Sequence, residues 1–270
     1  MEKLNDKTPK MALVYQEAIK FLWEVMPEEL SQEELIRYFD IAKTFKSKEE
    51  ILFRLLITLQ NRQMATKVIG FENKDKQPIF KKILFNYNAN TILENYTDTK
   101  LFECFCENFS IKNAESRNNL WRLYSKSIIS ACKFLNEFDS ADDFDRFVMQ
   151  FTYNAFSASA LPMLLEREVF GLGFPLACDW LKELGYTGYP KPDVHIKDIF
   201  YELDLCDNND YSAYKAVIEM ANVVEATPYK VDKIFYLIGS GNFYIHNIKI
   251  GRNKAEFIKR TKDLIISSEV

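Results

Sequence analysis

The sequence predicts an all-α fold, and three observations support this prediction. The chain has 270 residues, of which 47% are hydrophobic and 27% charged, the balance of an ordinary globular protein with a buried core. Its 8 glycines and 8 prolines are too few for the many short turns of a β-barrel or sandwich. Apolar residues recur at helical spacing through residues 1–170, with few alternating β-branched runs.

Two capping boxes indicate where helices begin near the N-terminus. Ser31 precedes Glu34 by three residues, and Ser47 precedes Glu50 at the same spacing. In a capping box the hydroxyl and the glutamate satisfy amides that have no partner within the helix. These starts and the apolar periodicity predict helices over residues 32–45 and 48–65, and the periodicity predicts others over 10–26, 77–87, 98–109, 115–136, 140–154 and 158–168.

The sequence shows no feature of a membrane or exported protein. It has no run of about 18 uncharged apolar residues, and Met1–Lys10 lacks the apolar stretch of a signal peptide. Five cysteines, an odd number without metal-ligand spacing, fit reduced thiols that are buried or half-buried. We therefore expect a cytoplasmic protein, with no membrane partner, no bound metal and no cofactor.

Charge is distributed unevenly along the C-terminal third of the chain. The net charge is −4 and the pI about 5.5, which argues against a protein that coats nucleic acid indiscriminately. Residues 193–225 contain eight acids and two bases, whereas residues 230–262 contain eight bases and two acids. The basic segment is a candidate phosphate-facing surface, and a solvated amphipathic helix is the alternative interpretation.

Glycine and proline gather near the start of the last hundred residues. Gly70 alone precedes residue 171, and four of the eight prolines lie between Pro162 and Pro192. A helix over 158–168 is followed by the turn Gly171-Leu172-Gly173 and by a helix over 175–184, for which Pro175 suits the first position. The sequence thus predicts a helix–hairpin–helix.

A hairpin of this kind can hold one DNA strand without a charged side chain. Glycines let the backbone amides at a helix N-terminus approach a phosphate, because no Cβ atom stands in the way. The candidate DNA-backbone-binding residues are therefore Gly171, Leu172, Gly173 and Pro175.

The segment after the hairpin carries a resemblance to a known family. The second helix ends at Gly185, and the loop that follows leads into Pro192-Asp193-Val194-His195. This order, with 20 residues from Gly173 to Asp193, resembles the helix–hairpin–helix (HhH-GPD) superfamily of base-excision DNA glycosylases, which includes endonuclease III, MutY and 8-oxoguanine glycosylase. Residues 231–239 (VDKIFYLIG) are similar to the closing helix of that family. The resemblance covers about residues 161–241.

The resemblance implies both a fold and an activity. It implies one glycosylase-like unit, residues 1–270, of two lobes: a central helical lobe of about 50–228 with the hairpin at 158–184, and a second lobe from about 1–49 plus 229–270. It implies a monomer that binds double-stranded DNA and removes a damaged or mismatched base flipped out of the duplex. A non-catalytic helix–hairpin–helix DNA-binding protein and an all-α interaction module, favoured by the acidic pI, are the alternatives.

Two departures from the family pattern narrow the expected chemistry. Members with lyase activity have a lysine two residues after the second hairpin glycine, where this chain has Pro175. We therefore expect a monofunctional glycosylase, although Lys191 and Lys197 are nearby amines that could substitute for that lysine. No cysteine follows Cys206, so the iron–sulfur cluster of some members is not expected.

Asp193 is the candidate catalytic residue that the resemblance implies. Cleavage of an N-glycosidic bond builds positive charge on the sugar, which an ionised carboxylate stabilises while it positions or deprotonates water. A purely structural interpretation is that Asp193 caps the N-terminus of the following helix; both roles can hold together. His195 and Lys191 are candidate assisting residues, although a first-turn bond to backbone or phosphate is the plainer role for His195.

Two further segments have assignable roles. Asn61, Arg62 and Gln63 end an apolar helix, and family members carry polar wedge residues at a comparable helix end, where they enter the gap left by the flipped nucleotide. A solvated helix end is the alternative interpretation. Gly239-Ser240-Gly241 lacks the lysine and the preceding strand of a phosphate loop, so it predicts a helix C-cap.

Overall fold

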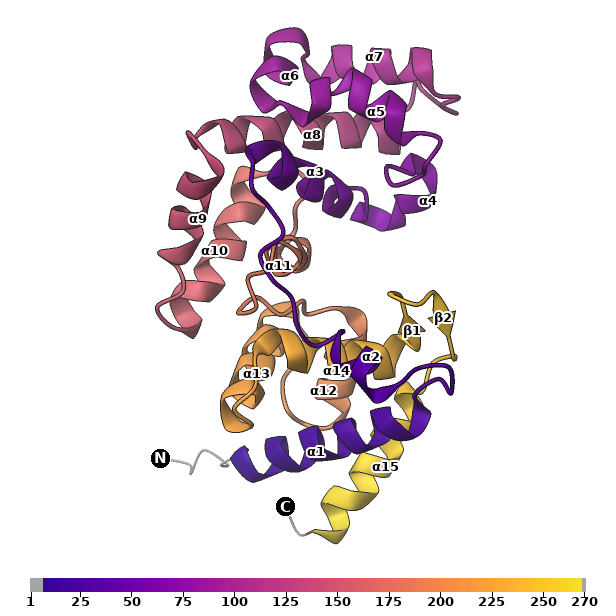
Figure 1. Cartoon of the computed structure of the whole chain (residues 1–270), viewed down its shortest axis with the longest axis vertical. Helices are drawn as coiled ribbons and strands as arrows, with labels where there is room; N and C mark the ends of the chain where they lie inside the picture. The colour runs from indigo at the N-terminus through magenta and orange to yellow at the C-terminus, as the bar shows by residue number, and fades with distance from the viewer. Residues whose placement is uncertain (1–6, 269–270) are drawn as a thin grey trace. The chain divides into compact units, whose positions relative to one another are not determined.

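The computed structural model describes residues 7–268 (Figure 1). Their regular secondary structure is helical apart from one pair of two-residue strands. The described residues form two compact units. The central unit is Lys43–Leu184, and the terminal unit comprises the chain up to Ala42 and from Gly185 onward. The chain thus re-enters the terminal unit at Gly185, whereas the sequence analysis placed this boundary near residue 229.

The terminal unit is built around one buried helix. α14 (Pro228–Ser240) is contacted by the other four long helices of the unit. The elements of this unit are α1 (Thr8–Val25), α2 (Gln32–Ile36), α12 (Val194–Glu202), α13 (Asp210–Val223), α14, the antiparallel pair β1 (Asn242–Phe243) and β2 (Ile248–Lys249), and α15 (Lys254–Ser267).

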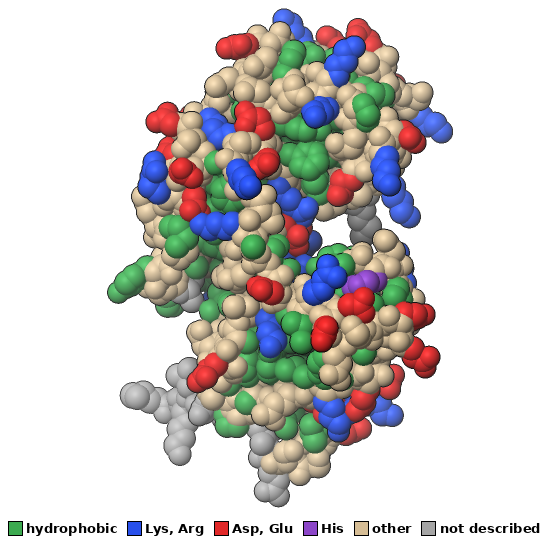
Figure 2. Space-filling view, in the orientation of Figure 1, with side chains coloured by type: hydrophobic (Ala, Val, Ile, Leu, Met, Phe, Trp, Pro, Cys, Tyr) green, Lys and Arg blue, Asp and Glu red, His purple; other side chains and the backbone are tan. Residues whose placement is uncertain are grey.

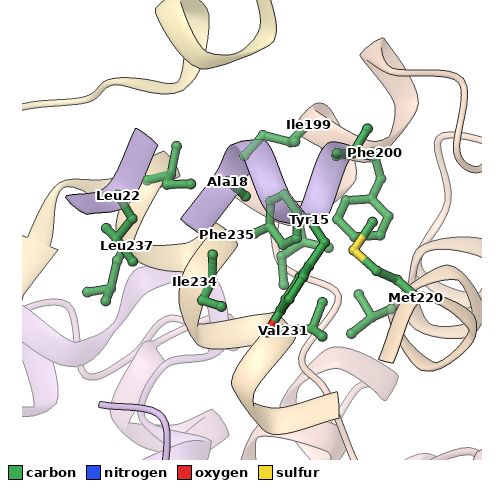
Figure 3. Close-up of a cluster of buried hydrophobic side chains, with 14 of the residues drawn as sticks. Tyr15, Ala18, Leu22, Ile199, Phe200, Met220, Val231, Ile234, Phe235 and Leu237 are labelled. Atoms are coloured by element: carbon green, nitrogen blue, oxygen red, sulfur yellow. The ribbon is translucent and has the colours of Figure 1, made fainter. Parts of the chain in front are cut away.

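Burial of apolar side chains explains the observed boundary. Ile199 and Phe200 of α12 and Met220 of α13 are fully buried, in one cluster with residues of α1 and α14 (Figure 3). Burying a side chain of this size contributes about 1.5–3 kcal/mol to the free energy of folding. Because these side chains find their core in the terminal unit, α12 and α13 belong there rather than with the hairpin.

The central unit is an all-helical body in which α8 contacts α3, α6 and α7. Phe80 and Phe109 stack on Trp121 at the start of α8, with ring centres 5.9 and 4.8 Å from it. The elements are α3 (Lys48–Leu59), α4 (Thr66–Ile69), α5 (Gln77–Ile83), α6 (Ala89–Asn95), α7 (Asp98–Asn108), α8 (Leu120–Asn136), α9 (Ala141–Met149), α10 (Ala155–Glu168) and α11 (Phe174–Glu183), with 3-10 turns at Arg62–Met64 and Phe85–Tyr87.

The capping box predicted at Ser31 is confirmed, whereas at Ser47 only one of the two expected hydrogen bonds is present. The hydroxyl of Ser31 accepts the N–H of Glu34, whose carboxylate accepts the N–H of Ser31. Ser47 likewise accepts the N–H of Glu50. The carboxylate of Glu50, however, accepts the N–H of Lys46 rather than that of Ser47, so α3 has an N-cap without the reciprocal bond.

Several helices end earlier than the periodicity predicted, and tertiary contacts give the reason. The helix expected over 32–45 ends at Ile36. Thr44 instead donates its N–H to the carbonyl of Leu184 and its hydroxyl to that of Glu183. These bonds satisfy carbonyls at the end of α11, which have no partner within the helix. The helix expected over 48–65 ends at Leu59.

The structure also tests the expectations for membrane spans and for the cysteines. Within residues 7–268, no helix is long and apolar enough to cross a membrane. Cys132 and Cys178 are buried, and Cys104, Cys106 and Cys206 are half-buried. The five cysteines are thus enclosed thiols, as the sequence predicted.

Candidate functional site

The hairpin predicted from the sequence is present in the central unit. α10 ends at Glu168 and α11 begins at Phe174. The connection is fixed to α8, because the hydroxyl of Ser130 accepts the N–H of Phe170 at 2.9 Å and donates to the carbonyl of Glu168 at 3.2 Å. Leu172, between the two glycines, is buried. The turn is therefore held in place by packing and by hydrogen bonds.

The two hairpin glycines have different structural roles. Gly171 has φ +88°, and a Cβ atom there would lie 2.7 Å from the hydroxyl of Ser127. A side chain at Gly171 is thus excluded both by the left-handed backbone and by α8. Gly173 has φ −69° and caps α11, and a Cβ atom there would meet nothing within 4 Å. The positive φ of the turn is therefore confined to Gly171, and Gly173 faces open space.

Pro175 occupies the second position of α11, one residue later than expected, because the helix begins at Phe174. The missing N–H is still no loss there, since the first four amides of a helix have no partner within it. The position where lyase members carry their lysine therefore has no amine.

Two cations lie against the aromatic residue of the hairpin. The guanidinium carbon of Arg62 is 4.7 Å from the ring centre of Phe170, and the ammonium of Lys126 is 4.0 Å from the same ring. Both distances are within the range of favourable cation–π contacts. The hairpin thus has positive charge beside its turn, which sequence analysis did not predict because Arg62, Lys126 and Phe170 are far apart in the chain.

The structure separates the three candidate wedge residues. The side-chain oxygen of Asn61 accepts the hydroxyl of Thr66, and Arg62 packs on Phe170. Gln63 is exposed and has φ +52°, which places it in the left-handed region that few non-glycine residues adopt. Gln63 is thus the member of this trio whose side chain extends into solvent.

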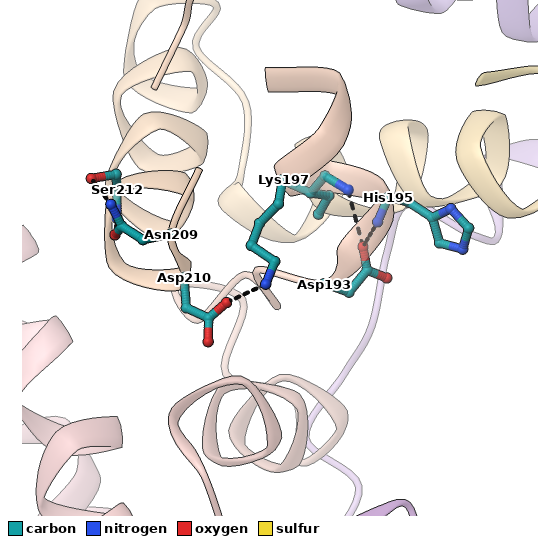
Figure 4. Close-up of polar contacts among 7 residues, drawn as sticks. Asp193, His195, Lys197, Asn209, Asp210 and Ser212 are labelled. Carbon is teal, nitrogen blue, oxygen red and sulfur yellow. Dashed lines mark hydrogen bonds and ion pairs between the residues drawn. The ribbon is translucent and has the colours of Figure 1, made fainter. Parts of the chain in front are cut away.

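Asp193 lies in the terminal unit, at the N-cap of α12 (Figure 4). Its Oδ1 accepts the N–H of His195 at 2.9 Å and that of Ile196 at 3.0 Å. Its Oδ2 makes no hydrogen bond with any residue of 7–268. The predicted cap is therefore present, and it fixes the carboxylate through one oxygen while leaving the other for a ligand.

The loop that carries Asp193 is fixed to α14. Asp232, which is 1% exposed, accepts the N–H of Lys191. The N–H of Asp193 in turn donates to the carbonyl of Lys191 at 2.8 Å. A buried carboxylate thus holds the backbone two residues before Asp193. Asp232 lay within the segment that resembled the closing helix, but its role depends on this tertiary contact and was missed.

Two side chains of α12 that the sequence singled out, the candidate assisting residue His195 and the alternative amine Lys197, point in different directions. The ammonium of Lys197 pairs with Asp210 at 2.6 Å, and the imidazole of His195 points away from the carboxylate of Asp193 (Figure 4). Burial lowers the pKa of His195, and the nearby charge of Asp193 opposes this shift. The lowered pKa favours the neutral imidazole, whose Nδ1 is buried without a hydrogen-bond partner among residues 7–268.

Two glycines at the C-terminal end of α14 have different roles, and the sequence predicted only one of them. A Cβ atom on Gly239 would lie 2.5 Å from the Cβ of His195. Gly241 ends α14 in the left-handed conformation, so the C-cap predicted for this segment is confirmed. A glycine inside a helical pattern was the one signal for the contact at Gly239.

Acidic and basic side chains are interspersed on the surface (Figure 2). Three bases of the segment 230–262 pair with acids of the terminal unit. Lys254 pairs with Asp198, and Lys262 pairs with Glu202 at 2.6 Å. Arg260 pairs with two glutamates of α1, Glu17 and Glu24. Part of the candidate phosphate-facing segment is therefore neutralised by the acids around it.

A comparison with solved structures identifies the fold. The structure is similar to the crystal structure of the Methanocaldococcus jannaschii 8-oxoguanine glycosylase/lyase in complex with a 15mer DNA containing 8-oxoguanine, with a TM-score of 0.50. The match covers 83% of this chain and 96% of that one, at 17% sequence identity. The fold is that of a helix–hairpin–helix DNA glycosylase.

Comparisons at the level of sequence find no relative of this chain. No family model matches the chain, and no curated protein matches it. At 17% identity the likeness concerns the fold alone, because one fold supports different functions. The reaction that this chain carries out therefore depends on its own site residues.

Proposed function

We propose that this protein is a monofunctional DNA glycosylase that removes a damaged or mismatched base flipped out of duplex DNA. The observation that carries the proposal is the geometry of Asp193, whose Oδ1 caps α12 while its Oδ2 makes no bond within residues 7–268. A carboxylate held in this way is pre-oriented for a ligand at no cost in side-chain ordering. The similarity in fold to a glycosylase/lyase supports the glycosylase part of the proposal.

In the proposed reaction water replaces the base at the anomeric carbon of the nucleotide. The bond between C1′ and the base nitrogen breaks, and its electron pair leaves with the base. Positive charge then develops on the deoxyribose, and the Asp193 carboxylate stabilises it. The carboxylate also accepts a proton as the water oxygen bonds to C1′. The departed base takes up one proton from solvent on its nitrogen, and the carboxylate releases the one that it accepted. The products are therefore the free base and an intact strand with an abasic site.

The hairpin supplies the proposed grip on the DNA backbone. Gly173 opens to solvent at the N-terminus of α11, where the helix dipole favours a phosphate. Arg62 and Lys126 add positive charge beside Phe170. Gln63 is the proposed wedge, because an exposed amide can bond to the base left unpaired by flipping.

Gly173→Val is expected to weaken binding to all DNA duplexes alike, by on the order of tenfold at 0.1 M salt, the value of one phosphate contact. The valine side chain would occupy the open space at the start of α11 without meeting the protein, so folding is expected to persist. Titration of fluorescent duplexes of several sequences, with Gly173→Ala as the smaller control, measures the effect. Unaltered affinity in a folded Gly173→Val variant would show that the hairpin is not the grip.

A panel of duplexes tests the function directly. Oligonucleotides with oxidised, alkylated, deaminated and mismatched bases are incubated with the protein and scored for abasic sites by alkaline cleavage. Excision of one class supports the proposal. Binding without excision, even with preference for an abasic-site analogue, would indicate a non-catalytic DNA-binding protein, and absence of DNA binding would indicate an interaction module.

We expect no efficient strand cleavage after base removal. Pro175 provides no amine, and the ammonium of Lys197 is engaged by Asp210, so a Schiff base with the sugar is not expected. Borohydride added during turnover should therefore trap no stoichiometric protein–DNA adduct. An adduct that disappears in Lys191→Ala or Lys197→Ala would assign the nucleophile to that lysine and overturn the monofunctional proposal.

A further inference from the structure

The ion pairs of the terminal unit leave some basic side chains unneutralised. Lys249 on β2 and Arg252 in the following turn are exposed and pair with no carboxylate among residues 7–268. Lys254, two residues after Arg252, pairs with Asp198. The strand pair and the turn after it therefore present two exposed cations that have no partner in this part of the chain.

The C-terminal end of α14 anchors this turn. A Cβ atom on Gly241 would lie 1.5 Å from the carbonyl oxygen of Gly251, and the N–H of Ile250 donates to the carbonyl of Gly241 at 3.0 Å. The backbone of Arg252 thus lies between the Gly251 contact on one side and the ion pair of Lys254 on the other. A fixed backbone reduces the freedom that the exposed side chain loses when it binds a ligand.

The same end of α14 also anchors the start of α12. His195 packs on Gly239, two residues before Gly241. Lys254, two residues after Arg252, pairs with Asp198, which lies on the same helix, α12, that Asp193 caps. The charges of Lys254 and Arg252 are close enough to help lower the pKa of His195. Arg252 therefore lies near His195, and His195 lies two residues after Asp193.

The charge around Asp193 makes a cation here useful for DNA binding. Asp198, Glu202 and Asp210 are already paired, with Lys254, Lys262 and Lys197 respectively. Asp193, at the start of α12, pairs with no cation among residues 7–268. A carboxylate that must approach a phosphate backbone is repelled by it. Exposed cations beside α12 would offset this repulsion where the strand comes closest.

We propose that Lys249 and Arg252 form a phosphate-binding surface that holds the DNA backbone on the terminal unit, beside Asp193. The inference rests on the proposed glycosylase function and adds to it a contact separate from the hairpin of the central unit. Its partner is the phosphate backbone of duplex DNA, read without regard to base sequence.

The test is the salt dependence of binding to a duplex that contains an abasic-site analogue. Lys249→Gln and Arg252→Gln are each expected to reduce the slope of log affinity against log salt by about one, and to lower affinity by on the order of tenfold at 0.1 M salt. Arg252→Lys, which keeps the charge, should retain the slope. Lys20→Gln is the matched control, since Lys20 is an exposed base of α1, outside the segment 230–262, with no ion pair within residues 7–268.

The outcomes separate this inference from the proposed function. Wild-type protein that binds and excises, with both glutamine variants equal to wild type or to the Lys20→Gln control, would overturn the surface and leave the glycosylase proposal standing. Wild-type protein that fails to bind DNA would overturn both. A loss of slope in both glutamine variants, absent in the control and restored by Arg252→Lys, supports the surface.

Discussion

Asp193→Asn is expected to lower base excision by at least about 100-fold, on the order of 3 kcal/mol of transition-state stabilisation. Asparagine is nearly isosteric with aspartate, and its side-chain oxygen can still accept the N–H groups of His195 and Ile196 that Asp193 now accepts. The substitution thus removes the charge and keeps the cap. Single-turnover excision, measured together with the affinity for an abasic-site analogue, isolates the chemical step.

A surface acid of the same unit provides the control for this experiment. Asp204, whose side chain is 89% exposed, has φ +52°, a conformation that asparagine also tolerates. Asp204→Asn is expected to leave excision, binding and stability unchanged. If Asp193→Asn behaved as this control does, Asp193 would be a helix cap alone, and the glycosylase proposal would lose its catalytic group.

Gly241→Ala is expected to lower the free energy of unfolding by about 3 kcal/mol. The left-handed backbone at Gly241, φ +61°, costs a residue with a Cβ atom roughly 1–2 kcal/mol. The new methyl group would overlap the carbonyl oxygen of Gly251, and overpacking of this kind typically adds about 1–3 kcal/mol. Urea unfolding measures the change.

Gly188 offers the matched control for the stability measurement. A Cβ atom there meets nothing within 4 Å, and its backbone is not in the left-handed region. Gly188→Ala is expected to change the free energy of unfolding by no more than about 0.5 kcal/mol. Equal stability of Gly241→Ala and Gly188→Ala would contradict the close approach of Gly251 to α14 and remove the anchor argued for Arg252.

Local signals predicted much of the fold. The caps at Ser31 and Ser47, the apolar periodicity and the glycine turn at Gly171 each depend on residues close in the chain, and the structure contains each of them. The helix expected over 32–45 failed because Thr44 satisfies carbonyls of α11. The sequence analysis placed the return of the chain to the terminal unit near residue 229 rather than at Gly185, because packing between helices distant in sequence decides this boundary.

The candidate site was predictable to the same extent. The cap formed by Asp193 follows from its place before a helix, so the sequence located it. The role of Asp232 depends on a hydrogen bond to Lys191, 41 residues away, and no local pattern indicates such a bond. Arg62 carried the signal of an exposed helix end, but it packs on Phe170, a residue that proximity in sequence does not bring near.

The split composition of the terminal unit has a consequence for synthesis of the protein. α1 packs against α14, which begins at Pro228. A ribosome that adds roughly 5–20 residues per second therefore completes α14 about 10–40 s after α1 has been made. Until then Val14, Ala18 and Phe21, which are buried in the finished fold, have no core to join. During synthesis the apolar face of α1 thus stays exposed until α14 is made, while the central unit, continuous in sequence, can fold as soon as it emerges.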